Sequence, residues 1–255
     1  MSDSTSVLYE VDGAIARVTL NRPEKKNALN DEVIASLKLF LRQANEAASV
    51  RVVVITGAGS DFCSGADVAA LQKIAAGSVN ENVDDARSLM ELFVLIRQVS
   101  VPVVAAVRGK ALAGGCGLAS ACDLILASSD ATFGYPEVRI GFVPAMVMAI
   151  LRRNVSEKRA FELITLGKQI SATEALEFGL VNRVCTSESF ASDVDAYVRD
   201  FEKMSKSAVA LTKSLFYQMD GMSFGAALET GVDVNVLARL TEDCQQGIAK
   251  FLAKK

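Results

Sequence analysis

The sequence contains no histidine among its 255 residues. This absence excludes Ser–His–Asp and Cys–His nucleophilic systems and most zinc sites. Any acid–base chemistry must therefore use Asp, Glu, Lys, Tyr or Cys side chains. Cysteine is also sparse: five are dispersed along the chain and none forms a CxxC motif. This pattern favours reduced, mostly buried thiols and gives no sign of a disulfide framework.

Long apolar runs are missing as well. The longest, VPAMVMAIL at 143–151, is far shorter than the roughly 18 residues that suggest a membrane span. Residues 1–13 show neither a basic start nor an apolar core, so we expect no secretory signal and a cytoplasmic protein. The net charge of −3 disfavours nucleic acid as the main partner.

With 51% apolar and 22% charged residues, the chain can bury a substantial hydrophobic core and is expected to be folded. Hydrophobic patterns predict two strands, 6–11 and 14–21, around a turn at Asp12–Gly13. Asn30 is a suitable N-cap for the helix that follows. Three further strands, rich in β-branched or small apolar residues, alternate with helices and predict an α/β fold with parallel pairing; they span 50–57, 101–109 and 123–128.

The second half of the chain has a more helical pattern. A capping box, Ser171 with Glu174, predicts a helix that stops at Gly179. A short strand is expected over 180–185, and 187–255 is expected to form three or four amphipathic helices. Residues 69–82 are poorly patterned. We expect a core over 1–190 and a helical C-terminal region over 191–255, within one fold unit.

Three segments place small residues between a strand and a helix start: FCSGADV (62–68), ALAGGCGLA (111–119) and TFGYPEVRIGFVP (132–144). Helix starts carry unpaired N–H groups that bind negative charge, and two converging on one oxygen would form an oxyanion hole. Each segment also has a purely structural interpretation. The glycines can reflect close packing, Asp67 can cap a helix, and Glu137 can pair with Arg139.

Four segments carry a combined signal: LNRPEKKNALN (20–30), FCSGADV, ALAGGCGLASACDL and YPEVRIGFVP. In their order and spacing they resemble the crotonase superfamily, which comprises the enoyl-CoA hydratases and isomerases. The resemblance continues through GLVNRV and covers nearly the whole chain. It implies an α/β spiral of ββα units with a helical C-terminal region, assembled as a homotrimer or a dimer of trimers. It also implies an acyl-CoA substrate, no metal, and no cofactor other than the coenzyme A of the substrate itself.

Carried over to this sequence, the resemblance assigns the thioester oxygen to the backbone N–H groups of Ser64 and Gly114, and general acid–base catalysis to Glu137. Asp67 and Asp123 are expected to be structural, although Asp67 lies in a substrate-binding segment. The lysines near residue 25 would face the phosphates of coenzyme A. The positions implied to contact substrate are Arg22, Lys25, Lys26, Ala28, Leu29, Gly65, Ala66, Asp67, Val68, Gly115, Gly117, Pro136 and Gly141.

One feature departs from the simple hydratases of this family. Those hydratases carry one glutamate at the position of Glu137 and a second glutamate at the position where this chain has Gly117. A single carboxyl group suffices to move a double bond. In hydration, the same group would have to take a proton from water and supply one to C2 at the same time. Gly117 with EVRIGFVPA nevertheless resembles hydratases of branched or carboxylated enoyl-CoAs, such as methylglutaconyl-type substrates.

Hydration and isomerisation therefore both stay open at this point. Ala145 disfavours a dienoyl-CoA isomerase, because that group has an additional aspartate there. A thioester hydrolase, and a non-catalytic acyl-CoA- or RNA-binding relative, are further alternatives.

Overall fold

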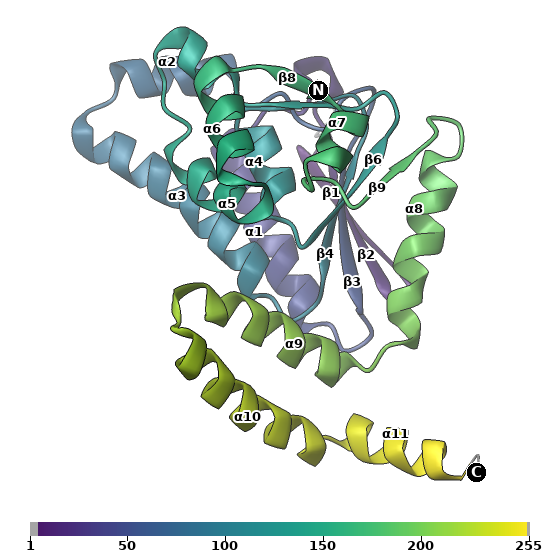
Figure 1. Ribbon diagram of the computed structural model, residues 1–255. Helices are drawn as coiled ribbons and strands as arrows, with labels where there is room; N and C mark the ends of the chain where they lie inside the picture. Colours follow the sequence, from purple (N-terminus) through teal and green to yellow (C-terminus); the bar gives the residue numbers. More distant parts are fainter. Residues whose placement is uncertain (1–4, 254–255) are drawn as a thin grey trace.

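The computed structural model describes residues 5–253 and is built around a six-stranded sheet (Figure 1). The beginning of segment 1–13, where we expect no secretory signal, lies outside these residues. The sheet has the order β1 (Val7–Asp12), β2 (Ile15–Leu20), β3 (Val52–Gly57), β4 (Val103–Val107), β6 (Leu124–Ser128) and β9 (Arg183–Cys185). Its first pair is the expected antiparallel hairpin, and every later pair is parallel, as the alternation of strands and helices predicts.

The central strands are apolar on both faces because helices cover both. Val52 to Ile55 of β3 and the whole of β4 are buried. One face packs in a large core against α1 (Asp31–Glu46), α3 (Val79–Gln98), α4 (Gly114–Ala121) and α5 (Ala145–Asn154). The other packs against α8 (Phe190–Arg199) through Phe190, Val194 and Val198.

A second sheet was not predicted from the sequence. It joins β5 (Lys110–Leu112), β7 (Thr132–Gly134) and β8 (Gln169–Ser171). Each strand has three residues, too few for a hydrophobic period to register. Strands β5 and β7 pair in parallel, and Ala113 donates its N–H to the Gly134 carbonyl at 2.8 Å. This pairing sets the start of α4 beside the segment that carries Glu137.

The remaining helices of this half confirm the capping signals. Asn30 caps α1 through the Val33 N–H at 2.9 Å, and the Ser171–Glu174 box opens α7 (Ala172–Glu177). The poorly patterned segment 69–82 is helical, forming α2 (Val68–Ala76) and the first turn of α3. No residue of α2 is buried, so it needs no apolar stripe. Shorter pieces complete this half: η1 (Pro23–Lys25), η2 (Pro136–Ile140) and α6 (Glu157–Leu166).

The C-terminal region is helical, as expected. After α8 and η3 (Asp200–Lys203) come α9 (Lys206–Gln218), η4 (Met219–Gly221), α10 (Phe224–Leu240) and α11 (Glu242–Leu252). Helix α9 lies under the core, whereas α10 and α11 run beyond it and bury no residue (Figure 1). Among residues 5–253, no helix is long and apolar enough to cross a membrane. All five cysteines are free thiols and four are buried.

Candidate functional site

Two glycine-containing segments are in direct contact at the start of α4. The Cys63 N–H donates to the Lys110 carbonyl and the Leu112 N–H to the Cys63 carbonyl, both at 2.9 Å. Gly65 has φ +101°, and a Cβ added there would lie 2.8 Å from Ala113 Cβ and 3.6 Å from Gly114 N. A side chain at Gly65 is therefore excluded by strain and by collision. The glycines bring the two backbones together.

The backbone N–H groups of these segments are not equally available. Ser64, predicted to bind the thioester oxygen, already donates its N–H to the Lys26 carbonyl at 3.0 Å. The structure contradicts that prediction, because this donor is used inside the protein. The N–H groups of Ala66 and Gly114 have no hydrogen-bond acceptor within residues 5–253.

Strand-like geometry explains the free N–H of Ala66. Leu29 forms a parallel bridge with Ala66, in which the Leu29 N–H donates to the Gly65 carbonyl and the Asp67 N–H to the Leu29 carbonyl. Because backbone groups alternate along an extended segment, the N–H of Ala66 itself points away from Leu29. The N–H of Gly114 is free because it belongs to the first turn of a helix.

Glu137 lies beside this helix start. It follows Pro136 in η2, directly after β7, and its side chain is half-buried. Its Oε2 is buried and has no hydrogen-bond partner among the described residues, which include Arg139. Burial raises the pKa of Glu137. Burial also raises the pKa of the Cys116 thiol to about 11, and the nearby Glu137 charge contributes to that rise.

Gly117 faces hydrocarbon. A Cβ at this position would lie 2.8 Å from Val147 Cγ2 and 3.3 Å from Phe93 Cζ. Gly117, Val147 and Phe93 are all buried. The place of a second carboxylate is thus filled by apolar side chains. Val147 and Phe93 were not predicted as site residues, because their apolar spacing in the sequence marks them only as core.

Arg22 and Asp67 form a nearly buried ion pair that holds two predicted site segments together. Arg22 Nη2 lies 2.5 Å from Asp67 Oδ2, and Nη1 donates to the Ala28 carbonyl at 2.7 Å. The hydrogen bond from Arg22 lowers the pKa of Asp67. Asp67 also caps α2 by accepting from the Ala69 N–H at 3.0 Å, which confirms its structural role. Lys25 is half-exposed, with Nζ 3.6 Å from the same carboxylate.

Asn27 is a structural residue of this segment that was not predicted from the sequence. It is buried with φ +54°, and its side chain accepts from the Arg22 N–H and donates to the carbonyls of Ala58 and Asp61. Lys26, beside it, is exposed and also has a positive φ of 51°. These bonds pin the backbone of 22–29 and leave its lysine side chains toward solvent.

The other predicted positions flank this arrangement. Ala28, Leu29 and Gly115 are buried beneath the two contacting segments, and Leu29 Cδ1 would lie 3.4 Å from a Cβ on Gly114. Val68 is 70% exposed at the start of α2. Gly141 ends η2 in the left-handed region with φ +77°.

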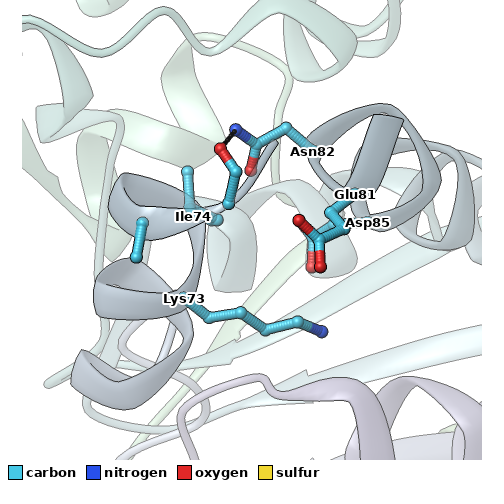
Figure 2. Close-up of a pocket in the computed structure, with 7 residues that line it drawn as sticks. Lys73, Ile74, Glu81, Asn82 and Asp85 are labelled. Atoms are coloured by element: carbon cyan, nitrogen blue, oxygen red, sulfur yellow. Dashed lines mark hydrogen bonds between the residues drawn. The ribbon is translucent and has the colours of Figure 1, made fainter. Parts of the chain in front are cut away.

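A cavity of about 210 Å³ opens between α2 and α3. Figure 2 shows Lys73 of α2 and Glu81 and Asp85 of α3 around it. Lys73 pairs with Asp31 at 2.6 Å. None of the predicted site residues lines this cavity. Its lining residues are Lys73, Ile74, Ala76, Gly77, Glu81, Asn82 and Asp85.

In a comparison with known protein families, residues 10–255 match the family described as enoyl-CoA hydratase/isomerase. A Thermus thermophilus protein named as a candidate enoyl-CoA hydratase is 39% identical over 95% of this chain and 96% of its own. A crotonyl-CoA hydratase of Syntrophomonas wolfei is 32% identical, covering 98% and 96%. The crystal structure of an enoyl-CoA hydratase from Mycobacterium smegmatis superposes with a TM-score of 0.93 at 30% identity, covering 98% and 97%.

Proposed function

The chain belongs to the enoyl-CoA hydratase/isomerase family, and we propose that Glu137 is the only general acid–base for its chemistry on an enoyl-CoA. One observation carries this assignment: the carboxyl is half-buried beside the start of α4, with an unpartnered oxygen and a raised pKa. A buried carboxyl without a partner is costly unless a ligand uses it. The chain has no histidine to share this role, and Glu137 is the carboxyl group that lies beside the free N–H groups of the site.

The free N–H groups of Ala66 and Gly114 supply the complementary charge. As a base removes a proton from C2 of the acyl group, negative charge moves onto the thioester oxygen. Two fixed N–H donors aimed at that oxygen stabilise the enolate more than the substrate. We therefore assign to Ala66 the role predicted for Ser64.

Coenzyme A enters as part of the substrate. The exposed Lys25 and Lys26 side chains lie on a backbone that Arg22 and Asn27 hold in place. Their ammonium groups would meet the phosphates of the nucleotide, while the acyl group reaches the Glu137 side. No bond to a further cofactor is needed for this proton transfer.

Within this family, the apolar surroundings of Gly117 favour double-bond migration over hydration. In migration, Glu137 takes the proton from C2, the double bond moves from C3–C4 to C2–C3, and the same carboxyl returns the proton to C4. Hydration also requires water to be aligned and deprotonated. Val147 and Phe93 leave no polar group at Gly117 to do this. Hydration is the second candidate, because the curated relatives carry hydratase names.

Product analysis in heavy water tests the proposal. Purified protein would receive straight-chain, branched and carboxylated 2-enoyl- and 3-enoyl-CoAs, alongside Glu137→Gln and the exposed control Glu177→Gln. We expect a shifted double bond and deuterium exchange in wild type and the control, and at least a 100-fold loss in Glu137→Gln. A 3-hydroxyacyl product would favour the second candidate. Free CoA, or full activity in Glu137→Gln, would refute the assignment.

We also propose that the protein assembles as a homotrimer or a dimer of trimers. Helices α10 and α11 expose a run of large apolar side chains, which in a monomer would face water: Phe224, Leu228, Val232, Val236, Leu240 and Ile248. A second copy is the occupant we expect, because this surface is continuous along the C-terminal region. Sedimentation velocity on wild type and Val232→Asp checks this, and a monomeric wild type would contradict it.

A further inference from the structure

A second cavity, of about 200 Å³, lies at the end of α4 opposite Gly114. Residues from α3, α5, α9 and η4 surround it, together with the segments on either side of β6 and β9. None of the residues assigned above to substrate or catalysis lines it. Those that carry the argument are Arg97, Arg153, Asp220, Tyr217, Asp123 and Asn182.

Two guanidinium groups and two carboxylates line the cavity, and a lysine outside the lining pairs with one of these carboxylates. Arg97 Nη1 donates to Asp220 Oδ2 at 3.1 Å, and Arg153 Nε forms an ion pair with the same oxygen at 2.7 Å. One carboxylate therefore serves two guanidinium groups. The other acid, Asp123, is already matched by Lys213 at 2.6 Å and by the Tyr217 hydroxyl at 2.7 Å. One positive charge is left without a counter-ion.

The same wall has one buried hydrogen-bond donor that finds no acceptor among residues 5–253. Arg97 Nε is buried and has no hydrogen-bond partner within residues 5–253. Its guanidinium is held 4.6 Å above the Tyr217 ring, which fixes its plane. Asn182 also lines the cavity but is exposed, and its Oδ1 accepts from the Ile125 N–H at 2.8 Å. A buried, unpaired donor on a charged group is expensive.

We propose that this cavity binds a small oxyanion between Arg97 and Arg153. An inorganic phosphate or the carboxylate of a small metabolite would supply acceptors for Arg97 Nε and the remaining guanidinium donors, and would neutralise the excess charge. The volume of about 200 Å³ admits a group of this size. Because Arg97 and Arg153 come from α3 and α5, the bound ion would tie these two helices together beside the Asp220 carboxylate that both arginines face.

Ligand-dependent thermal unfolding tests this site. Wild-type protein would be titrated with phosphate, and separately with acetate, at constant ionic strength set by chloride. A saturable rise in Tm of at least about 2 °C is expected with one or both oxyanions. Arg153→Gln and Arg97→Lys should lose it. The matched control Arg152→Gln, whose side chain is exposed and pairs with Glu157, should keep it.

The coenzyme A segment is tested separately, since its lysines could bind phosphate. The double variant Lys25→Gln/Lys26→Gln should retain the wild-type rise. Loss of the rise in this variant would overturn the proposal. So would an equal rise in Arg153→Gln, or no saturable rise with either oxyanion in wild type. Because no activity is measured, this test is independent of the proposed function.

Discussion

The packing at Gly117 leads to a quantitative prediction about its neighbour Val147. In Gly117→Ala the new Cβ would lie 2.8 Å from Val147 Cγ2, well inside the ordinary carbon–carbon separation of about 3.5–4.0 Å. Overpacking of this kind costs about 1–3 kcal/mol. Alanine is favoured over glycine inside a helix by about 1 kcal/mol. The net loss of unfolding free energy should be about 0–2 kcal/mol.

Val147→Ala alone should also destabilise the fold. It removes two buried methyl groups, each worth about 0.8 kcal/mol, and leaves a cavity that adds to the loss. The double variant should lose less unfolding free energy than the two single variants lose together, because the new Cβ at residue 117 enters the space that Val147 vacates. We expect the double variant to be more stable than additivity predicts by about 1 kcal/mol or more.

Urea denaturation of the four proteins at one protein concentration measures this coupling. Gly247→Ala is the matched control: it is a helical glycine in α11 with no neighbour within 4 Å of an added Cβ. It should gain up to about 1 kcal/mol. Additivity of Gly117→Ala and Val147→Ala within about 0.5 kcal/mol would show that the two side chains do not compete for the same space.

Three further predictions concern charged groups. Asp67→Asn keeps a capping side chain but loses the ion pair with Arg22. Because the pKa of Asp67 is lowered in the folded state, the ionised carboxylate stabilises the fold above its unfolded pKa. This stabilisation is lost as pH falls through the folded pKa. Denaturation curves of wild type and variant should thus converge in acid, and a pH-independent gap would contradict this. Lys213→Met leaves Asp123 without its cation and should cost about 3 kcal/mol in chemical denaturation; a loss below about 1 kcal/mol would show that the pair is dispensable. Burial raises the pKa of Glu137, so its ionised form destabilises the fold as pH rises above the unfolded value. Glu137→Gln should therefore lose activity yet unfold at a higher temperature than wild type at pH 7, with no difference near pH 3; lower stability of the variant at pH 7 would argue against this.

Several local features were predictable from the sequence because a few neighbouring residues encode them. The β-branched run of β3 and the Asn30 and Ser171 caps appear where expected. The second sheet was not predicted because its three-residue strands form only through pairing with one another. Helix α2 escaped because its residues stay exposed, so no apolar period marks it.

The candidate site likewise has features that the sequence predicted and features that only the folded structure shows. The resemblance of YPEVRIGFVP and three other segments to the crotonase superfamily pointed to Glu137, whereas the absence of histidine by itself left several residue types open. Which N–H groups stay free could not be predicted, because the Ser64 donor is taken by Lys26, a residue distant in the chain. Likewise only the folded structure brings Val147 and Phe93 against Gly117. Composition, caps and apolar runs are properties of short segments, whereas free donors and filled space depend on which distant segments meet.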